Sequence, residues 1–220
     1  MYRFAAAAFV VVLVVLAGMA SAQDQITLNG TASGAITFTG AGSGSGGSNL
    51  TMSLGSCSLG SHCITGTATG TGSLSSTGTY ELSGGPLSLT SVSPGSWNVS
   101  GILNFAYFNG GTNLLSGTLN LLNFTQVGSL GLFNDTLTAN LTGLSGSLAS
   151  SIGSSAITDI TVVIRNGVNL SALGNGANAS ASISSGEIFL PTPEPGSMVL
   201  FGSGLVAVGS MLRRRVKARA

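Results

Sequence analysis

Apolar and polar residues alternate with a period of two through the middle of the chain. The segment WNVSGILNFAY, residues 97–107, places its tryptophan, valine, leucine, phenylalanine and tyrosine on one face. Residues 135–143 and 159–165 alternate in the same way, with threonine and asparagine at many polar positions. Because successive side chains of a strand point to opposite faces, this pattern predicts half-buried β-strands.

Further alternating segments predict shorter strands, at residues 25–30, 35–40, 79–84, 86–92 and 186–191. Asn109-Gly110-Gly111 and Asn166-Gly167 lie between alternating segments and predict two tight hairpins. No stretch shows the 3.6-residue apolar period of a helix. Residues 23–190 are therefore expected to form an all-β domain, an antiparallel β-sandwich or jelly-roll-like fold. A β-solenoid would need a fixed repeat period, which the chain lacks.

Residues 39–49, TGAGSGSGGSN, consist mostly of glycine and serine. This composition is typical of flexible segments. We expect a loop between strands rather than a linker, because residues 23–38 are too few to fold alone.

Charged residues are almost absent from the predicted β domain. Arg165 is its only cation, and its anions are Asp24, Glu81, Asp135, Asp159 and Glu187. Nucleic acids are excluded as partners, because binding them requires several lysine or arginine contacts to phosphates.

The two cysteines, Cys57 and Cys63, lie close together with Gly60 between them. In an exported protein such a pair is expected to form a disulfide, which would stabilise the fold by roughly 2 kcal/mol. A zinc site would have to use His62 as well, and the chain has no other cysteine or histidine to complete the shell. We therefore expect no metal.

Candidate chemistry is sparse. His62 is the only histidine, no phosphate-binding, HExxH or GxSxG motif occurs, and the few acids are interpreted as surface charge. We expect no enzymatic activity and no cofactor. Trp97, together with Tyr80 and Tyr107, is a candidate sugar-stacking platform. However, Trp97 and Tyr107 share the apolar face of their segment, which favours a place in the core.

The N-terminal residues have the three parts of a secretory signal peptide. Arg3 supplies a positive charge, residues 4–16 are apolar, and Ala20-Ser21-Ala22 is a small-x-small site. After export through the Sec translocon, signal peptidase is expected to cleave between Ala22 and Gln23.

The C-terminal residues 191–220 combine a proline-rich box, an apolar run and a basic end. Residues 198–212 are expected to form a transmembrane helix, which would span about 22 Å of a ~30 Å hydrocarbon core. Arg213, Arg214 and Arg215 would stop transfer and keep residues 213–220 in the cytoplasm.

This three-part ending closely resembles the PEP-CTERM sorting signal of Gram-negative bacteria. Pro193-Glu194-Pro195 matches its Pro-Glu-Pro box, residues 198–212 its helix, and Arg213-Arg214-Arg215 its arginine cluster. The chain departs from the pattern by a longer end, VKARA, after the arginines. The resemblance implies recognition by an exosortase, a membrane cysteine transpeptidase, with Pro193-Glu194-Pro195 as the motif and cleavage near it.

The resemblance also implies a transient inner-membrane intermediate and a final place on the cell surface or outside the cell, in species that make exopolysaccharide. We expect a structural protein of the surface or of the biofilm matrix, associated with exopolysaccharide. Two alternatives remain: a carbohydrate-binding module that uses Trp97, and a self-assembling fibre subunit built from strands with few charges.

Overall fold

The structure, a computed structural model, describes residues 24–71, 76–129, 132–152 and 158–190. Residues Gln23–Pro191 form one unit, which is considered by itself. The expected signal peptide (1–22) and sorting segment (191–220, with its helix at 198–212) lie outside the described residues. Among the described residues, no helix is both long enough and apolar enough to cross a membrane.

The described residues are almost all in strands. These are β1 (Gln25–Ser33), β2 (Ile36–Gly44), β3 (Gly47–Leu54), β4 (Ser56–Cys57), β5 (Gly60–Ser61), β6 (Cys63–Gly70), β7 (Thr77–Gly84), β8 (Leu87–Ser93), β9 (Ser96–Ser100), β10 (Leu103–Asn109), β11 (Thr112–Ser129), β12 (Leu132–Ser145), β13 (Thr158–Asn166) and β14 (Asn178–Phe189). A short helix, α2 (Ala149–Ile152), and a single 3₁₀ turn, η2 (Leu170–Ala172), complete the elements. The expected all-β domain is confirmed.

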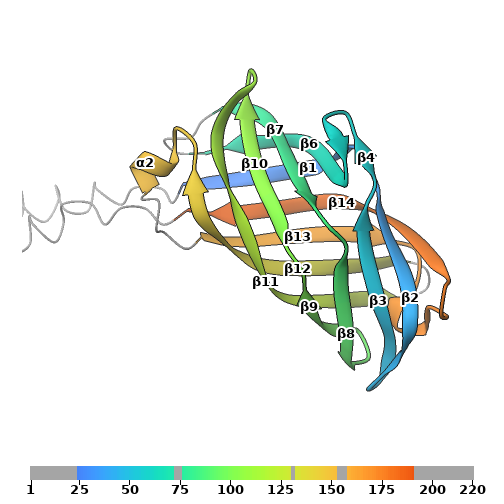
Figure 1. The fold of residues 1–220 in the computed structure, drawn as a ribbon. Helices are drawn as coiled ribbons and strands as arrows, with labels where there is room; N and C mark the ends of the chain where they lie inside the picture. Colours follow the sequence, from blue (N-terminus) through green and yellow to red (C-terminus); the bar gives the residue numbers. More distant parts are fainter. Residues whose placement is uncertain (1–23, 72–75, 130–131, 153–157, 191–220) are drawn as a thin grey trace, which may run out of the picture. The chain divides into compact units, whose positions relative to one another are not determined.

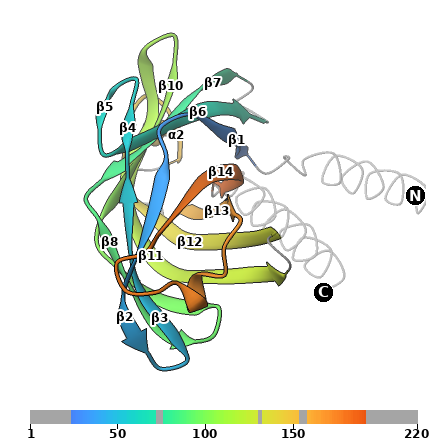
Figure 2. The same ribbon diagram turned by 90° about the vertical axis from the view of Figure 1, so that its right-hand side faces the viewer.

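Twelve of the described strands form one antiparallel sheet, in the order β1-β6-β7-β10-β11-β12-β13-β14-β2-β3-β8-β9. Two further pairings, β1 with β14 and β9 with β11, close this sheet on itself. Figures 1 and 2 show the result: β7, β8 and β10 lie on one side of the core, and β12, β13 and β14 on the other. The arrangement is sandwich-like, with both walls belonging to one continuous sheet.

The closed sheet is largely a meander of long, bent strands. β1 and β2 pair with opposite halves of β14, and β10 and β9 pair with opposite halves of β11. Most consecutive strands are neighbours, so the connectivity, which the sequence did not specify, is mainly that of a meander. The physical reason is that short turns join most of these strands, which favours pairing between neighbours over Greek-key crossings.

Glycine permits the bend between β1 and β2. Gly34 has φ +91°, in the left-handed region, and a Cβ built on it would lie 2.5 Å from the carbonyl oxygen of Cys63. A side chain at this position would therefore collide with the backbone of the neighbouring strand. The sheet can turn here because the residue is glycine.

The turns differ from expectation in two places. Residues 39–49, expected as a loop, form the end of β2, a two-residue turn at 45–46 and the start of β3, and the strands pair from Ile36 with Leu54 to Gly44 with Gly47. Their backbone hydrogen bonds outweigh the low strand propensity of glycine. The tight hairpin expected at Asn166-Gly167 is also wrong, because a longer connection containing η2 separates β13 from β14. The hairpin at Asn109-Gly110-Gly111 is confirmed by the pairing of Asn109 with Thr112.

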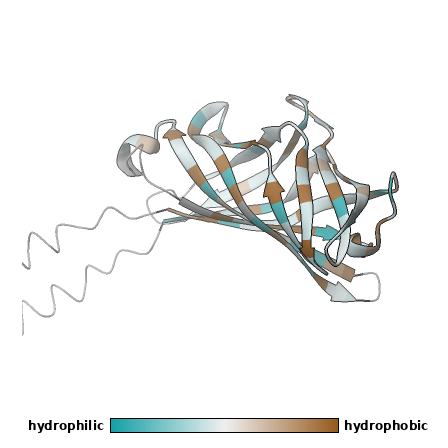
Figure 3. Ribbon diagram, turned by 60° about the horizontal axis from the view of Figure 1, so that its bottom comes forward, coloured by the Kyte–Doolittle hydropathy of each residue, from teal (hydrophilic) through white to brown (hydrophobic). Residues whose placement is uncertain are grey.

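Apolar side chains from both walls fill the interior, and Figure 3 shows brown and teal positions alternating along many strands. The ring centroids of Trp97 and Phe124 lie 5.5 Å apart, and those of Phe38 and Phe124 5.4 Å apart.

Two buried tyrosines satisfy their hydroxyls within the fold: Tyr80 donates to the Gly30 carbonyl (2.6 Å) and Tyr107 to the Ser76 carbonyl (2.7 Å). The predicted inward faces of residues 135–143 and 159–165 are confirmed by burial of their alternate apolar residues.

Candidate binding site

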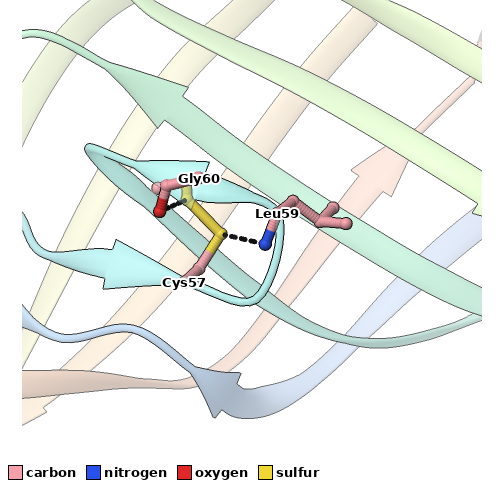
Figure 4. Close-up of a disulfide and its surroundings, with 4 residues drawn as sticks. Cys57, Leu59 and Gly60 are labelled. Atoms are coloured by element: carbon pink, nitrogen blue, oxygen red, sulfur yellow. Dashed lines mark hydrogen bonds between the residues drawn. A yellow bond between two sulfur atoms is a disulfide. The ribbon is translucent and has the colours of Figure 1, made fainter.

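The expected disulfide is present. Cys57 and Cys63 are bonded across the small hairpin of β4 and β5, which is inserted between β3 and β6 (Figure 4). The Leu59 N–H donates to Cys57 Sγ across 3.4 Å, and the Leu59 side chain at the turn is 61% exposed. His62 adopts a positive φ of 57° next to the bonded Cys63. The disulfide therefore explains both cysteines as structural residues.

Metal ligands are not gathered in the described ranges. No group of three or more histidine, cysteine, aspartate or glutamate side chains there lies close enough to hold a metal ion.

Trp97 lies in the core, with 0% of its surface exposed. Its Nε1 donates a 2.8 Å hydrogen bond to the carbonyl of Ser48. Tyr80 and Tyr107 are equally buried. The preference for core over platform is confirmed, and Trp97 as a sugar-stacking residue is corrected, because a buried ring has no face to offer a ligand.

Candidate binding groups lie instead at one end of the closed sheet. We call it the Arg165 end: there β11 passes into β12, and β13 ends at Asn166. At the opposite end, the terminal end, Gln25 of β1 pairs with Phe189 of β14. Because neighbouring strands of the meander run in opposite directions, the turns alternate between these two ends.

A buried polar network underlies the Arg165 end. Asp135, on the inner face of β12, is 0% exposed. Gln126 Nε2 donates a 2.8 Å hydrogen bond to Asp135 Oδ1, and Asn166 Nδ2 donates to Asp135 Oδ2. Gln126 also accepts from the Leu170 N–H (2.8 Å) and donates to the Val168 carbonyl (3.1 Å). Asn166 Oδ1 accepts from the Val168 N–H across 2.8 Å. The network joins three strands to the connection that follows β13.

Burial is the main influence on the pKa of the Asp135 carboxyl. Desolvation raises the pKa of Asp135 to about 6 from its ordinary value of 3.8, although the hydrogen bonds from Gln126 and Asn166 act to lower it. Both carboxyl oxygens accept N–H groups whose orientation is set by other partners in the network. Asp135 therefore acts as a fixed acceptor that orients the turn after β13.

A shallow hollow of about 410 Å³ opens at this end. It is lined by Leu132, Arg165, Asn166, Gly167, Ser180, Ala181 and Ser182. Arg165 is exposed, and within the described residues its guanidinium makes neither an ion pair nor a hydrogen bond. The single cation of residues 23–190 thus lines a hollow in which its donors can reach a ligand.

Exposed apolar side chains also gather at the Arg165 end. Val127 and Leu132, on either side of the β11–β12 turn, are 72% and 73% exposed. Val168, in the connection after β13, is 39% exposed, and its carbonyl accepts from Gln126. Of these side chains, Leu132 lines the hollow and offers apolar contact to a ligand that lies there.

A second hollow of about 400 Å³ lies on the outer face of β7, β10, β11 and β12. Its polar side chains hydrogen bond to one another: Asn113 donates to Ser116 (2.9 Å), and Ser116 contacts Ser145 (2.8 Å). Glu81 is its charged residue. This hollow is a polar surface whose groups are already partly satisfied.

Sequence patterns anticipate only part of this site. Arg165 is visible in the sequence as the lone cation, whereas the expectation that Asp135 lies on the surface is wrong, since it lies in the core. Its neighbours Thr136 and Asn134 are polar, so the alternating pattern alone places position 135 inside, with Leu137. Position 135 alternates in phase with the buried Leu137, and this is the sequence feature that could have predicted its burial. The charge of aspartate, however, favours a place on the surface.

The family model of the PEP-CTERM protein-sorting motif matches residues 191–215 of the chain. The match includes Pro193-Glu194-Pro195 and Arg213-Arg214-Arg215, and confirms the resemblance seen in the sequence. The motif implies an exported protein that passes the membrane and is processed by an exosortase. No curated protein and no solved structure matches the chain.

Proposed function

We propose that the mature chain is a non-enzymatic protein of the cell surface or extracellular matrix that associates with exopolysaccharide. The sorting motif at residues 191–215 supports an extracytoplasmic location, because it implies export and exosortase processing. The β domain would then be the part that meets the polysaccharide.

The observation that carries this proposal is the outer face of the closed sheet. One cross-strand row, from β11 through β12, β13, β14 and β1 to β6, presents mainly hydroxyl and amide groups: Asn123, Thr138, Thr161, Glu187, Thr27 and Thr69. Neighbouring strands are about 4.8 Å apart, so these groups form a regular, nearly uncharged series of donors and acceptors. A hydroxyl-rich polymer can hydrogen bond to such a series without displacing counterions.

The scattered reactive groups support a non-catalytic role. His62 lies on the disulfide-bonded turn, and Asp135 is buried against two amides. A general acid or base must reach its substrate within hydrogen-bond distance, which Asp135 in the core cannot do.

Sheet closure disfavours the fibre alternative. Fibres that grow by strand addition need an exposed strand edge with unpaired N–H and C=O groups. In the described sheet, the pairings of β1 with β14 and of β9 with β11 occupy edges that would otherwise be available.

Co-sedimentation of the mature protein with exopolysaccharide isolated from its host tests the proposal. Binding without any release of reducing sugar is the expected result. Failure to bind, or turnover of the glycan by pure protein, would disprove the proposed function. The same preparation serves for both readouts.

The proposed location is tested separately by the intact mass of the protein from its host and by the fraction that contains it. A chain from Gln23 to the neighbourhood of Pro193-Glu194-Pro195, in the medium or on the surface, is expected. A chain that retains Arg213-Arg214-Arg215 in the inner membrane would mean a permanent anchor, and surface release would be wrong.

A further inference from the structure

We propose that the hollow around Arg165 binds an acidic sugar residue, such as a uronate, of the polysaccharide. The proposal rests on the polysaccharide association proposed above and names its charge class and its site. Residues 23–190 hold one cation, and that cation lines a hollow of about 410 Å³ with no carboxylate partner among the described residues.

Strand register gives Arg165 two polar neighbours. On β12, Asn134 lies directly opposite Arg165, and on β14, Ser182 lies directly opposite it. Cross-strand neighbours have Cβ atoms about 5 Å apart, so amide, guanidinium and hydroxyl form a row of about 10 Å. A guanidinium pairs with a carboxylate through two parallel hydrogen bonds, and the flanking amide and hydroxyl suit the hydroxyls of the same sugar or its neighbours.

Apolar groups complete the hollow. Leu132 and Ala181 line it beside Arg165, and Leu132 is 73% exposed. The C–H face of a pyranose ring can cover this apolar surface while its carboxylate reaches the guanidinium. Burial of exposed leucine would add hydrophobic stabilisation to the charged contact.

The floor of the hollow is held in place before a ligand arrives. The side chain of Asn166, next to Arg165, donates to the buried Asp135 and accepts from the Val168 N–H. Asn166 and Gly167 both line the hollow. Because this turn is fixed by the core, little conformational entropy is lost there on binding.

The charge balance favours a ligand that needs only one cation at its binding site. Nucleic acids and densely sulfated polymers require several cations, and this domain has one against five anions. Neutral glycans would leave the guanidinium unused. A polymer that carries one carboxylate per sugar or per repeat fits one arginine flanked by neutral hydrogen-bonding groups.

Affinity electrophoresis of the mature protein in gels that contain polygalacturonate or dextran tests the site. We expect retardation by polygalacturonate, weakened by added salt because the contact is exposed. Arg165→Gln should weaken this binding at least about ten-fold. The affinity of Arg165→Lys for polygalacturonate should lie between those of the wild type and Arg165→Gln. Binding of dextran should not change. Glu81→Gln, a charge change in the second hollow, serves as the matched control and should behave like the wild type.

Equal binding of polygalacturonate by wild type and Arg165→Gln would overturn the inference. Since the Arg165 side chain is exposed and unpaired within the described residues, the variant should keep the wild-type thermal midpoint, which verifies its fold. Host exopolysaccharide bound equally by both proteins would leave the proposed function intact and disprove this site. Host exopolysaccharide bound by neither would disprove both.

Discussion

The backbone amide of Leu190 donates a 3.0 Å hydrogen bond to the carbonyl of Asp24, so the two ends of the described domain lie side by side. Cleavage after Ala22 would therefore leave the new N-terminus beside the strand that leads into the sorting motif. Pro193 follows Leu190 by three residues, a stretch of about 10 Å when fully extended. An exosortase that cuts near Pro193-Glu194-Pro195 would work close to the terminal end of the folded domain.

Closure of the sheet can be tested by a cross-link between β1 and β14. Because Asp24 and Leu190 are hydrogen bonded, the next pair, Gln25 and Phe189, is non-hydrogen-bonded, with Cα atoms about 4.5 Å apart. The double variant Gln25→Cys/Phe189→Cys should form a second disulfide and raise the free energy of unfolding by about 5 kcal/mol at most. Non-reducing electrophoresis and thermal melts measure both effects.

Each single-cysteine variant is the control for this cross-link. A double variant that remains fully reduced under oxidising conditions would mean that β1 and β14 do not pair.

Asp135 should make stability depend on pH. Its folded pKa of about 6 lies above the ordinary 3.8, so the folded state binds the proton more tightly than the unfolded state. The resulting stabilisation is complete below pH ~3.8 and is lost as pH rises through 6, a total of about 3 kcal/mol. Chemical denaturation between pH 3.5 and 7.5 measures it.

The variant Asp135→Asn removes this titration and is the reference. As pH falls from about 7 to 4, the wild type should gain unfolding free energy relative to the variant. A difference that stays constant over this range would show that Asp135 does not titrate with a raised pKa.

The bend between β1 and β2 depends on glycine at position 34. Gly34→Ala should cost more than about 2 kcal/mol, because φ is +91° and the new Cβ would lie 2.5 Å from the Cys63 carbonyl oxygen. Gly85→Ala is the matched control, since a Cβ there has no neighbour within 4 Å. Urea denaturation should show that Gly85→Ala stays within about 0.5 kcal/mol of the wild type. Equal losses in both variants would contradict the requirement for glycine at this bend.

Trp97 should matter for stability and not for sugar binding. Trp97→Phe removes the hydrogen bond to the Ser48 carbonyl and part of the contact with Phe124, and should cost about 2 kcal/mol. Exopolysaccharide binding, measured well below the melting temperature, should equal that of the wild type. If the variant lost binding but kept wild-type stability, Trp97 would be a ligand contact and this prediction would be wrong.

Local patterns are sufficient for part of the fold. Period-two alternation locates β12 and β13 and their inward faces, since each side chain's direction follows from its position in the strand. It does not reveal that residues 97–107 break into β9 and β10, or that residues 39–44 and 47–49 belong to two paired strands. Both depend on hydrogen bonds to partners distant in sequence, which no local signal reports.

The candidate site is less predictable than the fold. Arg165 is visible as a lone cation, but its neighbours Asn134 and Ser182 belong to strands before and after it in the chain. Only the register of three strands brings these groups into one row. A shift of one residue in that register would send their side chains to opposite faces of the sheet.

The sequence by itself determined the strand-forming segments, the disulfide pair and the sorting motif, because alternation, close cysteine spacing and a contiguous box are local properties. Tertiary structure alone decided that the sheet closes through β1 and β14, that Asp135 is buried, and that Arg165 lines a hollow. Each of these results from pairing between segments far apart in the chain. Such pairing depends on the summed hydrogen bonding and packing of the whole sheet rather than on any one segment.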